Sequence, residues 1–256
     1  MQIFLKNLIC WLHGNNLQNV AYLSLQMVAL LVSHLLALPF GRKLGMRTHR
    51  AFIAVVTEVA IVYIQMAIIC EILEEIVPSH IPIMNSYYNN VGRTFILVPF
   101  SAVLTSKILK HDLKRTLALY AFAQPLIWGL ASLPCLLAGC CRGYPCEWGV
   151  YNVEAQTYVF PTQALNAIGL CAIVCFIVIR TKKRGYEPDG LEYPIALILI
   201  GLTRFCTEFL MDNPKIAYGL SSLSFDSLVM MATGLVSLLV ISCMNRNKRR
   251  AVFSAK

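Results

Sequence analysis

The chain has 256 residues, of which 57% are hydrophobic and only 14% are charged. Soluble domains are about 45–50% apolar and roughly 25% charged, so this composition excludes a water-soluble globule and indicates an integral membrane protein. The net charge of +9 does not indicate nucleic acid as a partner, because the basic residues lie between apolar stretches and form no stripe interleaved with aromatic residues. We expect one membrane domain over residues 1–256.

The apolar stretches are long enough to cross the hydrocarbon core as helices, which takes about 20 residues each. Residues 1–16 predict a helix that lies in the membrane interface. A removable signal peptide is not expected there, because no small-residue cleavage site follows. A basic tail, 245–256, ends the chain. Between them the sequence predicts an all-α bundle of seven transmembrane helices over 17–244, at 17–40, 51–70, 91–109, 116–137, 162–180, 190–211 and 223–244.

The connections between these predicted spans differ sharply in charge. One alternate set holds seventeen Lys and Arg residues, whereas the opposite set holds only Lys6, Arg93, Arg142 and Lys215. Because basic residues concentrate in cytoplasmic loops, this asymmetry predicts a cytoplasmic C-terminus and, with seven crossings, an N-terminus outside. The remaining basic residue, Arg204, falls within the sixth span.

Arg204 and Glu208 stand four residues apart in the outer half of that span, on one face of its helix. Charged side chains inside a membrane span are costly and are therefore candidates for function. Two interpretations stay open. The pair forms an ion pair that stabilises helix packing, or Arg204 grips a phosphate or phosphoglycerol headgroup while Glu208 orients it. Other polar residues also gather on the outer side, which favours a site open to the outer leaflet.

Four of the ten cysteines form a cysteine-rich loop at the outer end of the fourth span: Cys135, Cys140, Cys141 and Cys146. Their spacing differs from the paired clusters of structural zinc sites and no His is near, so we expect no metal. On an oxidising face, packing with a disulfide from Cys146 to Cys140 or Cys141 is one interpretation. A nucleophilic thiol is another, since the neighbouring Arg142 would favour a thiolate.

Several motifs around these residues follow one another in a characteristic order. They are the stretch 135–143, then Trp148-Gly149-Val150, Pro161-Thr162-Gln163, the stretch 201–210 and Gly219-Leu220-Ser221. Together they resemble the bacterial prolipoprotein diacylglyceryl transferase family, in particular its members with Gly-Cys-Cys-x-Gly. The similar part covers about residues 133–238.

This resemblance implies an enzyme of the bacterial plasma membrane, with its site facing the outer side and no cofactor. It would move a diacylglyceryl group from phosphatidylglycerol to the lipobox cysteine thiol of a lipoprotein precursor. By the same resemblance, Arg204 and Glu208 are the catalytic residues, with Arg204 on the phosphate. The substrate-binding residues would be Gly139, Arg142, Gly143 and Gln163.

The sequence also departs from the family's signature Gly-Arg-x-Gly-Asn-Phe-x-x-x-Glu. Ser132, Pro134, Cys135 and Cys140 occupy the positions of its Arg, second Gly, Asn and Glu. Two alternatives therefore stay open. One is a lipid transferase with a different acceptor, in which Cys135, Cys140 or Cys141 is the nucleophile. The other is a non-catalytic lipid-binding or scaffolding membrane protein.

Overall fold

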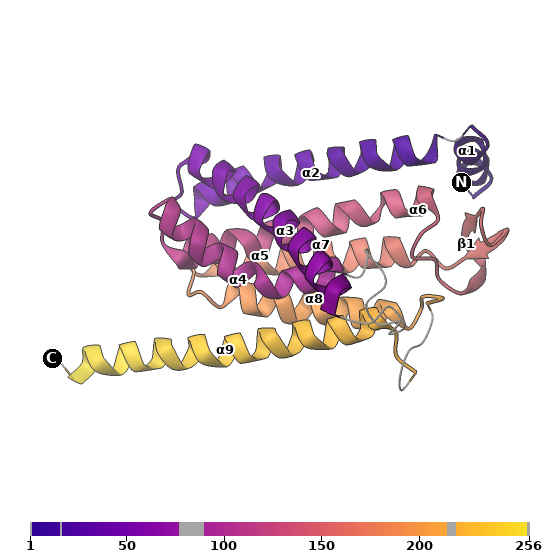
Figure 1. The fold of residues 1–256 in the computed structure, drawn as a ribbon. Coiled ribbons are helices and arrows are strands. Elements are labelled where there is room, and N and C mark those ends of the chain that lie inside the picture. The colour runs from indigo at the N-terminus through magenta and orange to yellow at the C-terminus, as the bar shows by residue number, and fades with distance from the viewer. Residues whose placement is uncertain (1, 16, 77–89, 214–218, 255–256) are drawn as a thin grey trace.

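The computed structural model describes residues 2–15, 17–76, 90–213 and 219–254, so Lys215 lies outside the described residues. The long helices run side by side as an elongated bundle, and a short helix and a β-hairpin lie at one end (Figure 1). The elements are α1 (Gln2–Gly14), α2 (Gln18–Lys43), α3 (Thr48–Ile76), α4 (Asn90–Ile108), α5 (Leu113–Ser132), α6 (Pro134–Ala138), β1 (Pro145–Asn152), β2 (Thr157–Val159), α7 (Thr162–Lys183), α8 (Glu192–Glu208) and α9 (Ser222–Ser254).

Each of the seven predicted apolar stretches falls on a helix of the bundle. Among the described residues, four helices are long and apolar enough to cross a membrane: Gln18–Lys43, Leu113–Ala138, Thr162–Lys183 and Leu223–Arg246. This arrangement indicates a multi-pass membrane protein. Crossing by all seven helices stays a prediction.

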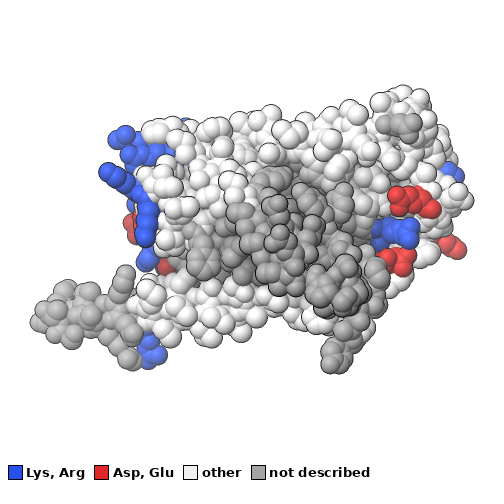
Figure 2. Space-filling model, in the orientation of Figure 1, with Lys and Arg blue, Asp and Glu red and all other residues white. Residues whose placement is uncertain are grey.

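The outer surface of the bundle is apolar along much of its length. On α9, Val236 is 60% exposed and Leu239 is 57% exposed, and α2 exposes Met27 to a similar degree. Such a continuous apolar face is costly in water and is suited to lipid. In the view of Figure 2, the described surface between the two ends of the molecule is almost free of Lys, Arg, Asp and Glu.

The centre of the bundle is α5, which packs against α2, α7 and α8. A run of its residues from Thr116 to Leu126 is buried on every side of the helix, as expected of a helix that is apolar all round. Tyr120 lies in this run, and its hydroxyl donates to the Ala54 carbonyl at 3.1 Å. This bond ties α5 to α3.

The connections at one end of the bundle carry most of the cations, and we call this the basic end (residues 42–50, 107–115 and 180–190). Figure 2 shows Lys and Arg gathered there. The connections contact one another: Arg115 Nη1 donates to the Gly45 carbonyl at 3.3 Å, and Lys43 Nζ lies 5.6 Å from the centre of the Tyr186 ring. The charge asymmetry of the sequence therefore corresponds to one physical end of the molecule.

An ion-pair network fixes the connection between α7 and α8 at the basic end. The two Asp189 carboxylate oxygens accept from Arg180 Nη2 at 3.2 and 3.0 Å, and Arg184 Nη1 lies 3.0 Å from Oδ2. The Leu191 N–H donates to Oδ1 at 3.0 Å. Burial alone would raise the pKa of Asp189, but the Leu191 N–H and the two arginines outweigh it and hold the pKa below its ordinary value of 3.8.

Replacing this carboxylate, Asp189→Asn, should destabilise the protein by about 1–3 kcal/mol, because two guanidinium groups lose a charged acceptor. Since the folded-state pKa is depressed, the stabilisation is complete above pH 3.8 and is lost as the pH falls through the folded-state pKa. Thermal unfolding in detergent near neutral pH measures the effect, with the exposed Glu187→Gln in the same connection as the control. Equal losses in the two variants would contradict this role.

The all-α prediction is incomplete, because an antiparallel hairpin of β1 and β2 lies between α6 and α7. Its register shifts between Pro145 and Val150, which both oppose Val159. A Cβ on Gly149 would stand 2.0 Å from the Val159 carbonyl oxygen, so this irregular pairing requires glycine there. The segment predicted to lie in the membrane interface forms the helix α1, and its place in the interface stays a prediction. The helix packs on the hairpin, where Lys6 Nζ lies 4.5 Å from the centre of the Tyr151 ring.

The predicted fourth span, 116–137, is also divided in the structure. It begins as α5 and continues as the short helix α6, with Leu133 between them and Pro134 in the first turn of α6. Proline has no N–H to continue the hydrogen bonding of the preceding helix but is well suited to start a new one. The break leads the chain into the cysteine-rich loop.

Candidate functional site

The loop after α6 docks onto the end of α8, at the end of the molecule opposite the basic end. The Asp212 N–H donates to the Arg142 carbonyl at 3.0 Å, and Gly143 pairs with Met211 as an isolated antiparallel bridge. Arg142 Nε lies 3.5 Å from Asp212 Oδ2, and both side chains are more than one third exposed. These contacts join a segment near residue 140 to one near residue 211.

Two residues at the start of α7 hold the two adjacent cysteines in place. Thr162 Oγ1 donates to the Cys141 carbonyl at 2.6 Å, and Gln163 Nε2 donates to the Cys140 carbonyl. Cys141 has a φ of 54°, a left-handed conformation that is uncommon and costly for a residue with a side chain. The start of α7 therefore stabilises a strained turn that carries both thiols. Gly139, with a φ of +76°, precedes this turn.

Three thiols lie together at this turn. The side chains of Cys135, Cys140 and Cys141 interact with one another, and the Arg204 charge acts on Cys141. Hydrogen bonds from the Cys135 and Cys140 thiols lower the pKa of Cys141 well below its usual range, and the Arg204 guanidinium lowers it further. Hydrogen bonds with Cys135 and Cys141, together with burial, raise the pKa of Cys140. The site thus favours a thiolate at Cys141.

Cys141 should consequently be alkylated by iodoacetamide at a lower pH than Cys140, because only the thiolate attacks. Peptide mapping by mass spectrometry, over about pH 6 to 9, gives the extent of labelling at each cysteine. Replacing the nearby cation, Arg204→Gln, should move the labelling of Cys141 to higher pH. Labelling of Cys140 before Cys141 would contradict the assignment of the thiolate.

Arg204 comes from α8 and stacks on an aromatic side chain of α5. Its guanidinium carbon lies 4.5 Å from the centre of the Trp128 ring, a cation–π geometry that fixes the plane of the guanidinium and leaves its edges for hydrogen bonding. A planar cation held in this way is suited to a phosphate or a carboxylate. The helices α5 and α8 pack directly on one another, so this geometry is set by the bundle.

Glu208 is buried one turn further along α8, and its described hydrogen bonds are with residues other than Arg204. Its Oε1 accepts from Ser221 Oγ at 2.5 Å and from Asn213 Nδ2 at 2.7 Å. Ser221 Oγ in turn accepts from the Ser224 N–H at 3.2 Å, as a cap at the start of α9. Between the described side chains of Arg204 and Glu208 there is no ion pair. Glu208 instead joins the end of α8 to the start of α9.

The predicted site residues therefore divide into two groups. Cys135, Cys140, Cys141, Gln163 and Arg204 come together at the turn that carries the two adjacent cysteines. Gln163 contributes to this group by holding the backbone of the loop. Gly139 and Gly143 form the second group, because the space around them leaves no room for a side chain. A Cβ on Gly139 would meet the Asn152 amide at 3.2 Å, and one on Gly143 would meet the Phe160 carbonyl oxygen at 2.5 Å.

The fourth cysteine of the predicted cluster, Cys146, lies in β1. Within the described part of the chain, Cys140, Cys141 and Cys146 are free thiols. No three described His, Cys, Asp or Glu side chains come together in a way that could hold a metal ion. The disulfide and the nucleophilic thiol both stay predictions for these cysteines.

The sequence gives no specific signal for several contacts of the site. Trp128 lies in the middle of an apolar span, where an aromatic residue gives no specific signal. Thr162 belongs to the motif Pro161-Thr162-Gln163, but the bond from its hydroxyl to the Cys141 carbonyl depends on the tertiary fold. Ser221 and Asn213, the partners of Glu208, are separated from it by the connection to α9.

Comparison with known proteins matches more than half of the chain to one protein family. The model of the family described as prolipoprotein diacylglyceryl transferase matches residues 94–240, more than half of the chain. The chain is 26% identical over 149 residues to the phosphatidylglycerol–prolipoprotein diacylglyceryl transferase of Clostridium tetani (strain Massachusetts / E88), covering 56% of this chain and 58% of that protein. It is 28% identical over 119 residues to phosphatidylglycerol–prolipoprotein diacylglyceryl transferase 2 of Clostridium perfringens (strain 13 / Type A), covering 43% and 46%. The chain spans about half the length of these curated relatives.

Proposed function

Since the chain belongs to the prolipoprotein diacylglyceryl transferase family, we propose that it transfers a diacylglyceryl group from phosphatidylglycerol to the cysteine thiol of a lipoprotein precursor. The observation that carries this proposal is the Arg204 guanidinium, which is stacked on Trp128 beside a cluster of thiols. The relatives named above act on these substrates according to their names. The matched region, 94–240, contains every proposed site residue of α6, α7 and α8.

The proposed reaction is a displacement at carbon. The thiolate sulfur of the acceptor forms a bond to the glycerol carbon that carries the phosphate, and the bond between this carbon and the phosphate oxygen breaks. Glycerol phosphate leaves with the electron pair, and the acceptor thiol loses its proton. Arg204 stabilises the growing negative charge on the leaving phosphate, which a planar, bidentate cation does better than a point charge.

In this proposal, the other residues near the cysteine turn hold the loop and the end of α8 in position. Thr162 and Gln163 hold the carbonyl groups of Cys141 and Cys140, and Gly143 permits the close approach of the loop to α8. Glu208 positions the end of α8 through Ser221 and Asn213, which keeps Arg204 in register with Trp128. Arg142 is exposed beside Asp212 and lies where a polar headgroup would enter.

We further propose the orientation in the membrane that the sequence predicts: seven crossings in the bacterial plasma membrane, with the basic end in the cytoplasm. The gathering of cations at one end of the bundle supports it. Arg204 lies towards the opposite end of the bundle, so the site would open to the outer leaflet. Lipoprotein precursors present their lipobox on that side in this proposal.

Complementation tests this function in cells. In a bacterial strain depleted of its own diacylglyceryl transferase, expression of this chain should restore processing of lipoprotein precursors. Immunoblots of the membrane fraction give the level of the protein. A protein that is present at normal level but leaves the precursors unprocessed would contradict transfer to lipoprotein thiols.

The thiolate at Cys141 supports a second candidate, in which this cysteine itself takes the diacylglyceryl group. The product would be a thioether, with glycerol phosphate again leaving. An alkyl thiolate is a poor leaving group from carbon, so passing the lipid on from this thioether would be difficult, and direct transfer to the acceptor is the better proposal. The intact mass of the protein after incubation with phosphatidylglycerol distinguishes the two: a stable diacylglyceryl adduct that Cys141→Ser removes would favour the second.

A further inference from the structure

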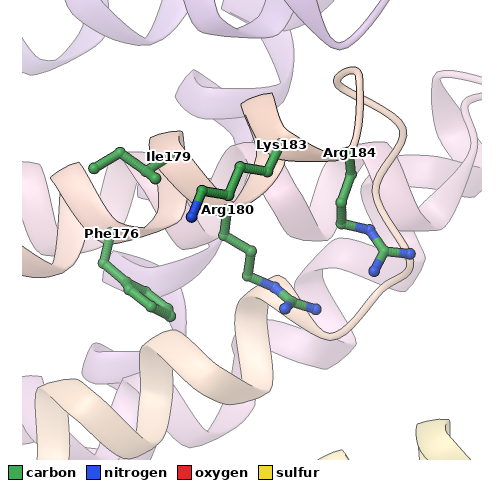
Figure 3. A pocket seen from close by; sticks show the side chains of 5 residues that line it. All are labelled: Phe176, Ile179, Arg180, Lys183 and Arg184. Carbon is green, nitrogen blue, oxygen red and sulfur yellow. The ribbon is translucent and has the colours of Figure 1, made fainter.

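A pocket of about 290 Å³ lies at the basic end, on the surface of the last turns of α7. Its lining combines two kinds of side chain, apolar and cationic: Phe176, Ile179, Arg180, Lys183 and Arg184. Figure 3 shows the three cationic side chains extending from the end of α7, with Phe176 about one turn before Arg180. None of these residues belongs to the proposed transferase site.

The two apolar residues of the pocket face outward from the bundle. Phe176 is 46% exposed and Ile179 is 53% exposed, and both lie in a helix that is long and apolar enough to cross a membrane. In a bilayer these side chains contact acyl chains. The cations follow them immediately towards the basic end, where a helix of this length leaves the hydrocarbon core. The pocket therefore changes from apolar to cationic along the direction in which a phospholipid changes from acyl chain to headgroup.

The charge of the pocket is not neutralised within the described residues. Asp189 accepts from Arg180 and pairs with Arg184, which fixes the two guanidinium groups on one side. Lys183 forms no ion pair with any described residue, and three cations thus face one carboxylate. Glu187 and Glu192 lie in or beside the same connection, but Glu192 accepts from the Gly190 N–H at 3.0 Å, and Glu187 is exposed. A net positive charge is left for a ligand.

We propose that this pocket binds an anionic phospholipid from the leaflet at the basic end, which is the cytoplasmic leaflet in the orientation proposed above. Lys183 and Arg184 bind its phosphate, and Phe176 and Ile179 contact its acyl chain. A free phosphate ion would use the cations but not the exposed apolar side chains. The helix α7 has 22 residues, which at 1.5 Å per residue is about 33 Å. The cysteine turn lies at the start of α7 and the pocket at its end, so the lipid in the pocket is separate from a donor lipid near Arg204. Its binding does not depend on transferase activity.

Native mass spectrometry of the purified protein, titrated with phosphatidylglycerol or phosphatidylcholine in detergent, tests the proposal. The variant Lys183→Glu should weaken the binding of one phosphatidylglycerol by about fivefold or more, from the contribution of one basic residue near an anionic headgroup. The matched control is Lys182→Glu, which changes the charge of the adjacent residue outside the pocket and should bind as the wild type does. Phosphatidylcholine should bind more weakly, and inorganic phosphate should not displace the lipid.

Three results would overturn the proposal. They are equal affinities for Lys183→Glu and Lys182→Glu, equal binding of phosphatidylcholine and phosphatidylglycerol, and displacement of the lipid by inorganic phosphate, which would indicate a plain anion site. The titration is repeated in the Arg204→Ala protein to separate the two sites. This variant should lose the donor lipid but keep the lipid at the pocket, so failure of the transferase proposal would leave this test intact.

Discussion

Replacing the stacked guanidinium, Arg204→Ala, should reduce diacylglyceryl transfer about a hundredfold or more. Loss of a bidentate charged contact to a phosphate costs about 2–5 kcal/mol when its partner is left in a desolvated site, and about 3 kcal/mol corresponds to a hundredfold in rate. The protein should remain folded, because Arg204 forms no ion pair with another described residue and contributes mainly its contact with Trp128. The measurement is the initial rate of lipid transfer to a synthetic lipobox peptide.

Two further variants show whether the effect depends on the shape and the position of the Arg204 side chain. Arg204→Lys keeps the charge but not the planar fork, so its rate should fall between those of the wild type and Arg204→Ala. Arg47→Ala removes an exposed arginine at the basic end and should leave the rate unchanged. If Arg204→Ala retained most of the activity while binding phosphatidylglycerol normally, another group would have to hold the phosphate.

The second large effect is expected at the contact between the cysteine-rich loop and α8. A Cβ added by Gly143→Ala would stand 2.5 Å from the Phe160 carbonyl oxygen and 2.9 Å from the Leu210 carbonyl oxygen. Both are backbone atoms, which cannot move away as the end of a flexible side chain can. We expect the loop to leave α8, with a loss of about 1–3 kcal/mol in the free energy of unfolding.

The same substitution should remove most of the transferase activity, since the loop carries Cys140 and Cys141 beside Arg204. Thermal unfolding in detergent and the peptide assay measure the two effects. The control is Gly14→Ala at the end of α1, where nothing lies within 4 Å of the new Cβ and alanine favours the helix. If Gly143→Ala were as stable and as active as Gly14→Ala, the loop could not be docked as described.

The helical part of the fold could be predicted well from the sequence, because hydropathy and helix length are local properties. Each apolar stretch lies on a helix, and the division of the fourth at Pro134 follows from a residue that is visible in the sequence. The hairpin could not be predicted in the same way. Its strands are short, and the register shift that requires Gly149 depends on pairing with Val159.

The site could be predicted only in part. The sequence indicates Arg204 because a cation inside an apolar span is costly, and it indicates the cysteines by their clustering. The four-residue spacing predicts a pair of Arg204 with Glu208. In the structure, Glu208 instead accepts a hydrogen bond from Ser221, and Arg204 lies over the ring of Trp128. Likewise, the strained conformation of Cys141 is stabilised by Thr162, which is 21 residues away in the chain.

The departures from the family's signature also have a structural counterpart. Ser132, at the position of the signature's arginine, accepts from Asn166 Nδ2 at 2.8 Å and so joins α5 to α7. Cys135 and Cys140, at the positions of its Asn and Glu, lie in the thiol cluster with Cys141. A hydrogen bond between two helices, at Ser132, and two thiols thus take the positions of the signature's polar groups. The arginine of α8, Arg204, is kept.

The most direct test of the central claim is the mass of a synthetic lipobox peptide after incubation with the purified protein and phosphatidylglycerol. We expect the peptide to gain one diacylglyceryl group on its cysteine, with release of glycerol phosphate. The gain should be absent with phosphatidylcholine and strongly reduced with Arg204→Ala. A peptide of unchanged mass, in the presence of folded protein that binds a phosphatidylglycerol which Arg204→Ala loses, would contradict lipid transfer to a peptide thiol.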